Sequence, residues 1–314
     1  MGLNHYDASL VRPFAKKGDF LQKRAVLSHL DPTLDGFQAM QTVLTIAGFD
    51  PSSGAGVTAD LMVFAAHALF GTSSITALTV QSTVGVRSTH AVPAEILRAT
   101  LECLESDLPP AGIKIGMLAT AANVAVVCDF LKTIRGRAAP VPIVFDPVLR
   151  SSSGRELLDA EGFTALRERL LPLVDWVTPN LAELSALTRL EVSQREHLPL
   201  AARALQTEVQ EGNQGVKLGV FATGGHLDPP DDFLLTPGGE ALWLPGTHIA
   251  TRATHGTGCA LSSAFLSRLV LGDTPAEAAE GAKRYVATAL ESAIPRGTGA
   301  SSINHLWRMS HPRD

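Results

Sequence analysis

The sequence predicts an α/β protein of three layers, in which a mostly parallel central sheet lies between two layers of helices. Two observations support this prediction. Short apolar runs typical of strands alternate with longer helical patterns along most of the chain, which is the order expected of strand–helix–strand crossover units. Several strand-like runs are apolar throughout, as expected when helices cover both faces of a sheet.

The strands are recognised by short apolar runs bounded by turn residues, and the helices by apolar residues three and four positions apart. In chain order, the predicted strands cover 43–47, 75–80, 112–117, 142–145, 176–178 and 216–222. The predicted helices cover 56–67, 95–104, 123–134, 161–171, 261–271 and 276–289. Ligands bind beyond the carboxyl ends of the strands in such sheets, so we expect the functional residues there.

Polar or soft side chains follow each of the first four predicted strands. A Gly/Ser loop, residues 48–56, follows the first and precedes a helix that carries Asp60; the later strands end at Gln81, Met117 and Asp146. Each residue also has an ordinary interpretation. Asp60 fits a solvated helix face, Gln81 a polar strand end, and Met117 core packing.

Length and composition indicate one large domain. The chain has 314 residues, 45% of them hydrophobic, enough for one large α/β core. Residues 1–39 have weak periodicity, so we expect a peripheral N-terminal extension that could be disordered, followed by a domain over 40–314.

Charge and cysteine usage restrict the partners. A net charge of −5 without a sustained basic patch argues against nucleic-acid and anionic-membrane binding and favours small molecules. The three cysteines form no CxxC pair, which predicts neither disulfides nor a thiolate metal site and fits a reducing cytoplasm. No apolar segment reaches the roughly 18 residues of a membrane span, and no signal core is expected.

The segment Thr254–Cys259 (THGTGC) is the most informative part of the sequence. It places a Gly-rich turn and a thiol before a helical run, so the N–H groups of residues 256–259 are expected to be unpaired first-turn donors that suit a phosphate. The helix start is also expected to lower the pKa of the Cys259 thiol. Phosphoryl transfer, acyl chemistry and a plain Gly turn before a core helix all fit these six residues. A hydrolase that pairs His255 with Cys259 is disfavoured, because no separate triad is evident.

A second motif, Asn180-x-x-Glu183, has two interpretations. It matches a capping box, in which Asn180 caps a helix and Glu183 returns to the Asn180 backbone N–H. Its carboxylate could also serve phosphate or metal binding.

Seven motifs follow one another in a fixed order: AGFDPSSGAGVTADL (47–61), ITALTVQSTVGV (75–86), KIGML (114–118), FDPVL (145–149), TPNLAE (178–183), GGHL (224–227) and THGTGC (254–259). In this order they resemble the hydroxymethylpyrimidine and phosphomethylpyrimidine kinases of thiamine biosynthesis, within the ribokinase-like superfamily. The resemblance covers about residues 40–308. It implies a ribokinase-like fold, a homodimer, and ATP-dependent phosphorylation of 4-amino-5-hydroxymethyl-2-methylpyrimidine, of its monophosphate, or of both.

The resemblance also implies roles for individual residues. The substrate pyrimidine is expected beside Gly48, Asp60, Gln81 and Met117. Nucleotide phosphates are expected beside Asp146, Asn180, Glu183, Thr223 and Gly225, with Mg²⁺ at Asp146 and Glu183, in part through water. The catalytic anion site is expected at Gly256, Thr257, Gly258 and Cys259, with Cys259 as base or positioning group.

Two departures from the family pattern leave alternatives open. Thr223 stands where a Lys is usual, and Ala253 where an Asn is usual; the missing Lys removes a positive charge, which Arg150, Arg155 or Arg252 could supply. One alternative is a pyridoxal or pyridoxine kinase, because related members of the superfamily share the same phosphate machinery. The other, motivated by the two departures, is a non-catalytic pyrimidine-binding regulatory protein.

Overall fold

The computed structural model describes residues 40–151, 154–212 and 217–310. The predicted N-terminal extension, residues 1–39, and Val216 at the start of a predicted strand lie outside these ranges. The chain divides into two units, Met1–Met40 and Gln41–Asp314. The second unit contains the whole fold described below.

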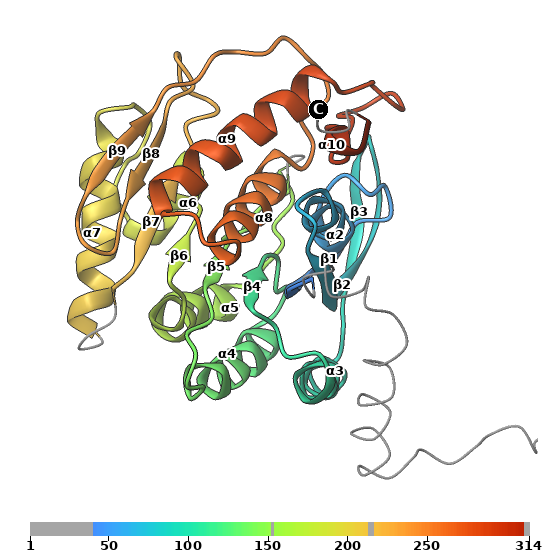
Figure 1. The fold of residues 1–314 in the computed structure, drawn as a ribbon, viewed down its shortest axis with the longest axis vertical. Coiled ribbons are helices and arrows are strands. Elements are labelled where there is room, and N and C mark those ends of the chain that lie inside the picture. The colour runs from blue at the N-terminus through green and yellow to red at the C-terminus, as the bar shows by residue number, and fades with distance from the viewer. Residues whose placement is uncertain (1–39, 152–153, 213–216, 311–314) are drawn as a thin grey trace, which may run out of the picture. The chain divides into compact units, whose positions relative to one another are not determined.

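A single nine-stranded sheet forms the centre of this unit (Figure 1). The strand order is β3-β2-β1-β4-β5-β6-β7-β8-β9. The six strands from β2 to β7 in this order run parallel, whereas β3, β8 and β9 pair antiparallel at the two edges. The strands are β1 Thr42–Phe49, β2 Phe70–Ser82, β3 Gly85–Ala91, β4 Gly112–Ile115, β5 Ile143–Phe145, β6 Trp176–Val177, β7 Gly219–Ala222, β8 Asp232–Leu235 and β9 Ala241–Leu244.

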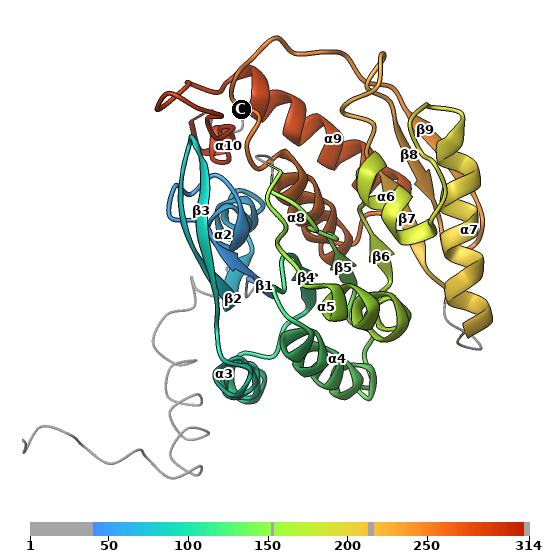
Figure 2. The ribbon, with the colours of Figure 1, turned by 180° about the vertical axis from the view of Figure 1, so that it is seen from behind.

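Helices cover both faces of the sheet, which confirms the predicted three layers. One face carries α2 Gly56–Ala66, α8 Thr257–Val270 and α9 Pro275–Glu291, and the short α10 Trp307–Ser310 contacts α2 (Figure 1). The opposite face, seen in Figure 2, carries α3 Ala94–Asp107, α4 Ala121–Arg135, α5 Ala160–Ala165, α6 Leu181–Thr188 and α7 His197–Gly212. A π-helical turn, Leu166–Leu170, and a 3₁₀ turn, Leu171–Leu173, follow α5.

Alternate residues of the parallel strands enter two separate hydrophobic cores. In β1, Val43 packs with the α2, α8 and α9 layer, whereas Leu44 packs with the α3, α4 and α7 layer. In β5, Val144 and Phe145 divide in the same way. Since successive strand residues point to opposite faces, these strands must be apolar at every position, and this made them recognisable in the sequence.

The structure contains elements that the sequence patterns did not indicate. Strand β3 (GVRSTHA) is polar and half-exposed, and β8 and β9 have only four residues each. Helix α7 was also missed, although it buries a regular stripe that includes Leu198, Ala202 and Leu205. The start of α6, in contrast, was indicated by the Asn180 capping box. Helix α8 begins at Thr257, one turn earlier than predicted.

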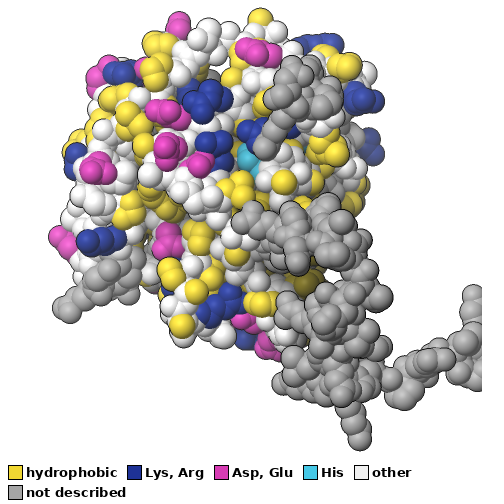
Figure 3. Space-filling view, viewed as in Figure 1, with side chains coloured by type: hydrophobic (Ala, Val, Ile, Leu, Met, Phe, Trp, Pro, Cys, Tyr) yellow, Lys and Arg dark blue, Asp and Glu magenta, His cyan; other side chains and the backbone are white. Residues whose placement is uncertain are grey.

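The described surface is that of a protein with mixed charges. On the face seen in Figure 3, acidic and basic side chains are interspersed with apolar ones. None of the helices in the described ranges combines the length and apolar character needed to cross a bilayer.

Candidate active site

A cavity of about 2210 Å³ lies along the carboxyl ends of the parallel strands. The starts of α6 and α8 and one side of α9 complete its walls. Of the candidate site residues predicted from the sequence, Asp60 is the one absent from its lining. The residues that do line it are Gly48, Gln81, Met117, Asp146, Asn180, Glu183, Thr223, Gly225, Gly256, Thr257, Gly258 and Cys259.

The start of α8 provides backbone donors to this cavity. Gly256 precedes the helix with φ 87°, a left-handed conformation suited to glycine. A Cβ at this position would lie 1.7 Å from the carbonyl oxygen of Gly54. The first bond within the helix joins the Ala260 N–H to the Gly256 oxygen, so the N–H groups of residues 257–259 have no partner within the helix. Helix starts of this kind can bind anions, so these N–H groups are a candidate anion site.

The prediction of a lowered pKa for Cys259 is wrong. Burial raises the pKa of this thiol to about 12. The Lys114 ammonium acts in the opposite direction, but the negative charge of Asp146 adds to the effect of burial. The cost of desolvating the thiolate therefore outweighs the pKa-lowering effect of the helix start, and Cys259 is a neutral thiol at pH 7. Its interaction with Asp146 lowers the pKa of that carboxyl, so the neutral thiol fits a positioning group better than a ready base.

The raised pKa predicts low reactivity of Cys259. In native protein treated with iodoacetamide near neutral pH, we expect the exposed Cys103 to be alkylated at least ~10-fold faster than Cys259, because the thiolate is the reacting form. Mass spectrometry of peptides measures both rates, and urea-unfolded protein serves as the control in which both thiols react. Preferential alkylation of Cys259 in native protein would show that its thiolate is populated.

Lys114 is a functional residue that sequence reasoning missed. Its side chain is fully buried, with Nζ 3.0 Å from each carboxylate oxygen of Asp60 and 3.9 Å from Asp146 Oδ2. Burial alone lowers the pKa of Lys114, but the Asp60, Cys259 and Asp146 charges together raise it above its ordinary value. The ammonium also lines the cavity. A charged residue inside the apolar strand motif KIGML was the signal that could have identified it.

Asp60 lies beneath the cavity and is fully buried. Besides Lys114, it accepts hydrogen bonds from the hydroxyls of Thr45 (2.5 Å) and Ser263 (2.8 Å). The expectation of direct substrate contact is therefore corrected. Its contacts with Thr45, Lys114 and Ser263 are all internal, and Asp60 influences the cavity through Lys114.

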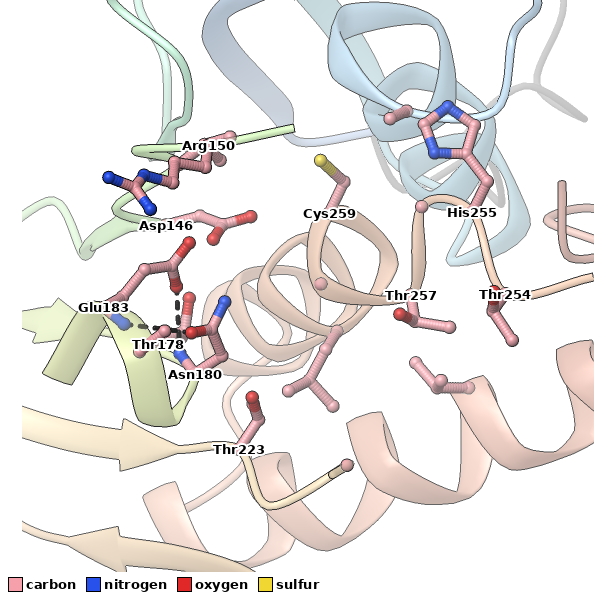
Figure 4. Close-up of a pocket in the computed structure, with 18 of the residues that line it drawn as sticks. Asp146, Arg150, Thr178, Asn180, Glu183, Thr223, Thr254, His255, Thr257 and Cys259 are labelled. Atoms are coloured by element: carbon pink, nitrogen blue, oxygen red, sulfur yellow. Dashed lines mark hydrogen bonds between the residues drawn. The ribbon is translucent and has the colours of Figure 1, made fainter. Parts of the chain in front are cut away.

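Asp146 and Glu183 bring two buried carboxyl groups to the same wall (Figure 4). Burial raises the pKa of Asp146; Lys114 lowers it, and Asp60 raises it further. Burial, followed by repulsion from Asp146, raises the pKa of Glu183 to about 8. Nearby, the Thr178 hydroxyl is buried without a hydrogen-bond partner in the structure. A cation would relieve the repulsion between the carboxylates and could offer this hydroxyl a partner, directly or through water.

Asn180 and Glu183 form the capping box at the start of α6. The Glu183 N–H donates to Asn180 Oδ1 (3.0 Å), and the Asn180 N–H donates to Glu183 Oε2 (2.9 Å). Both bonds are dashed in Figure 4. The capping interpretation is confirmed, and both side chains also line the cavity.

The Glu183 carboxyl predicts a pH dependence of stability. Its folded-state pKa of about 8 exceeds the ordinary 4.5, so the folded protein holds a proton that the unfolded chain releases. The stabilisation that comes from holding this proton is complete at pH values below the ordinary pKa, and it is lost as the pH rises through the folded-state pKa. We expect the free energy of unfolding to decrease from about pH 5 to about pH 8, and Glu183→Gln to remove part of that decrease.

Urea unfolding at several pH values, without Mg²⁺ or nucleotide, measures this effect. Glutamine also suits the capping box, so the substitution preserves the helix start. Glu161→Gln, at a residue without a capping-box partner in the structure, is the control and should leave the pH dependence unchanged. The prediction would be contradicted if the free energy of unfolding fell with pH equally steeply in wild type and in Glu183→Gln.

Cationic side chains line the cavity that also contains Thr223. Thr223 lines the cavity, and of the three proposed arginines Arg150 does so too, whereas Arg155 and Arg252 are not in the lining. Lys283 of α9, which the sequence did not suggest, also lines it. Its ammonium is 2.7 Å from Asp232 Oδ2. Ala253 is fully buried outside the lining.

The opposite end of the cavity is lined by Gly48, Met117 and Gln81. The β1 register shifts between Ala47 and Phe49, on either side of Gly48. A Cβ at Gly48 would lie 2.9 Å from Met117 Sδ, so glycine permits close approach of the thioether. This end is therefore a small, partly apolar compartment with one carboxamide.

Comparisons with known proteins agree with this geometry. The family model of phosphomethylpyrimidine kinase matches residues 50–304. The hydroxymethylpyrimidine/phosphomethylpyrimidine kinase of Haemophilus influenzae is 37% identical over 279 residues, which cover 86% of this chain and 98% of that protein. The enzyme of the same name from Rhizobium meliloti is 38% identical over 268 residues, or 84% of this chain and 97% of that protein.

Solved structures of kinases also resemble this chain. The phosphomethylpyrimidine kinase of Clostridium difficile has a TM-score of 0.67 and 33% identity, covering 79% of this chain and 99% of that one. An ADP complex of Bacillus subtilis pyridoxal kinase has a TM-score of 0.74 and 26% identity, covering 86% and 100%. With a family model that spans most of the chain and a ribokinase-like arrangement of sheet and cavity, this chain belongs to the phosphomethylpyrimidine kinase family.

Proposed function

We propose that this protein transfers the γ-phosphoryl group of ATP to 4-amino-5-hydroxymethyl-2-methylpyrimidine, to its monophosphate, or to both, in thiamine biosynthesis. One observation carries the proposal. The free N–H groups at the start of α8, the Asp146 and Glu183 carboxyls, and the Gln81 and Met117 compartment all line one cavity. A phosphoryl donor and a small heteroaromatic acceptor can therefore meet there.

The phosphate end of the cavity fits ATP and Mg²⁺. Within the described ranges no three His, Cys, Asp or Glu side chains converge to hold a metal by themselves. Asp146 and Glu183 instead fit Mg²⁺, which binds one or two carboxylates together with waters and substrate phosphates. Bound Mg²⁺ would neutralise phosphate oxygens. Asn180, Thr223 and Gly225 complete this wall, and the unpartnered Thr178 hydroxyl is one further candidate ligand.

The reaction depends on alignment and charge stabilisation. Phosphoryl transfer passes through a loose transition state in most analyses, so a strong base contributes little. The N–H groups of Thr257, Gly258 and Cys259 are fixed in place before the substrate arrives, and such preorganised donors stabilise developing negative charge. Lys114 adds a permanent positive charge beneath them. In this scheme the Cys259 thiol orients Asp146 and the incoming hydroxyl.

The substrate end fits an aminopyrimidine. The Gln81 carboxamide offers a donor and an acceptor to the ring, and the Met117 thioether packs adaptably on an aromatic face. The Gly48 backbone leaves room for the ring to approach β1. These three residues are the proposed substrate contacts.

We also propose a cytoplasmic homodimer. Leu78 and Val80, two residues apart on β2, are 48% and 50% exposed, and Val84 in the following turn is 74% exposed. Residues at this spacing share one face of a strand, so together they form an apolar surface of the kind that a second subunit covers. The use of ATP as the donor supports the cytoplasmic part of this proposal.

Parallel turnover assays test the proposed function. We expect ATP- and Mg²⁺-dependent phosphorylation of the pyrimidine or its monophosphate, with kcat/KM at least ~100-fold above that for pyridoxal. Pyridoxal is the second candidate because the B. subtilis pyridoxal kinase resembles this fold closely. Preference for pyridoxal would overturn the substrate assignment. Tight pyrimidine binding without turnover would instead support a regulatory protein.

A further inference from the structure

The His255 imidazole joins Asp50 of the Gly/Ser loop, residues 48–56, to Gln81 of the proposed substrate compartment. His255 Nε2 lies 2.7 Å from Asp50 Oδ2 and 3.1 Å from the Gln81 Nε2 atom. The His255 side chain is only 13% exposed and that of Asp50 only 5%. One ring nitrogen therefore has two polar neighbours in a space with little access for water.

The hydrogen bonds of Asp50 determine the state of that nitrogen. Asp50 Oδ1 accepts from the Ser52 N–H and hydroxyl, and Oδ2 accepts from the Ala55 N–H at 3.0 Å. Burial raises the pKa of Asp50, but the bonds from His255 and Ser52 outweigh burial and lower it. Asp50 is thus an ionised carboxylate that can only accept. His255 Nε2 must therefore carry a hydrogen, whether the ring is neutral or protonated.

This hydrogen in turn determines the orientation of the Gln81 amide. A nitrogen that carries a hydrogen in the ring plane cannot accept one from an amide NH₂, so the atom of Gln81 at 3.1 Å must be the carbonyl oxygen. The two ends of a carboxamide have nearly the same size and are assigned from their partners. Turning the amide end for end brings its nitrogen to the Thr79 hydroxyl, at the 3.2 Å of the present oxygen contact.

The reoriented amide also removes a conflict at the Thr79 hydroxyl. Thr79 Oγ1 lies 3.0 Å from the Phe49 carbonyl oxygen, which can only accept. The single Thr79 hydrogen goes to this carbonyl, so the Thr79 oxygen is free to accept from the Gln81 NH₂. With the opposite orientation, one hydroxyl hydrogen would have to serve both Phe49 and Gln81.

We propose that His255 is a positioning residue that fixes the Gln81 amide and thereby selects the hydrogen-bonding pattern of the substrate ring. This inference rests on the proposed function, in which Gln81 meets the ring. His255 shares its Nε2 hydrogen between Asp50 and one lone pair of the amide oxygen, and Thr79 accepts one amide N–H. One lone pair and one N–H remain for the ligand. A ring with an amino donor next to a ring-nitrogen acceptor matches this pair, whereas a ring carbonyl next to a ring N–H presents the reverse pattern.

Two isosteric substrates test the proposal. The 4-amino pyrimidine and its 4-oxo analogue differ in this donor and acceptor pattern, and kcat/KM is measured for each. We expect wild type to prefer the amino compound at least ~100-fold, because the wrong pattern leaves polar groups unpaired. In His255→Leu the Gln81 amide can turn, so the ratio of kcat/KM for the amino compound to that for the oxo compound should fall at least ~10-fold. The KM for ATP should change less than ~2-fold.

Matched variants distinguish positioning from loss of structure. His90→Leu removes an exposed imidazole that contacts Ser88 on β3 and should leave the ratio unchanged. Thr79→Val removes the other amide partner and should lower the ratio less than His255→Leu. An unchanged ratio in an active His255→Leu protein overturns the proposal.

A measurement on wild type keeps the proposal testable if His255→Leu fails to fold. Nitrogen-15 NMR of histidine-labelled protein, assigned with His255→Gln, reports which ring nitrogen carries hydrogen. A hydrogen on Nε2 is expected, and a bare Nε2 overturns the proposal. Wild-type protein that phosphorylates neither pyrimidine would refute the proposed function instead, because the NMR result does not depend on turnover.

Discussion

Replacing Lys114 with methionine is expected to lower the free energy of unfolding by about 3–5 kcal/mol and to abolish activity, because removal of one partner leaves buried charge uncompensated. The lost ammonium contacts both oxygens of Asp60 and lies 3.9 Å from Asp146. Methionine fills a similar volume, so the loss measures charge rather than a cavity. Urea unfolding and steady-state turnover measure the two effects.

Two further proteins make this prediction specific. Lys132→Met removes a lysine that is 61% exposed and should change stability by less than ~0.5 kcal/mol. The double variant Lys114→Met with Asp60→Asn removes both charges of the pair, while the amide oxygen can accept from one of the Thr45 and Ser263 hydroxyls and its NH₂ can donate to the other. It should recover part of the stability but none of the activity. Wild-type stability in the single variant would contradict the proposed role of this charge network.

Replacing Gly256 with alanine is expected to lower kcat at least ~100-fold, the effect typical of losing one preorganised anion-site donor. The new Cβ would lie 1.7 Å from the Gly54 oxygen, so the turn before α8 must move and its N–H groups move with it. Stopped assays with saturating ATP measure kcat, and thermal unfolding measures the accompanying loss of stability.

Gly272 provides a matched control just beyond the other end of the same helix. It also has a positive φ, 97°, but a Cβ there meets nothing within 4 Å. Gly272→Ala should therefore show only the backbone strain, about 1–2 kcal/mol, with wild-type kcat. If Gly256→Ala retained activity as well, the start of α8 would not be the main anion site.

The sequence predicted the layers well because burial on both faces leaves a direct pattern in the parallel strands. Val43 and Leu44 illustrate this, since each enters a different core. Edge strand β3 was missed for the converse reason. In β3 the residues are polar and half-exposed, so no apolar run marks them.

The sequence predicted the location of the candidate site residues better than their chemical state. Motif order placed most of the site residues on one cavity, but the state of Cys259 depends on tertiary burial, which outweighs its local helix position. The role of Lys114 depends on Asp60, 54 residues away, and local spacing cannot reveal such a pair. The contact between His255 and Gln81 spans 174 residues, so local spacing cannot reveal it either.

The capping box at the start of α6 also bears on the choice between metal ions. One oxygen of Glu183 is engaged by the Asn180 N–H, and one oxygen of Asp146 by the Ser262 hydroxyl. Ca²⁺ takes six to eight oxygens, often with both oxygens of a carboxylate, whereas Mg²⁺ keeps waters and requires few protein ligands. Carboxylates that are already committed in this way disfavour the larger ion, so a helix cap contributes to metal selectivity under the proposed function.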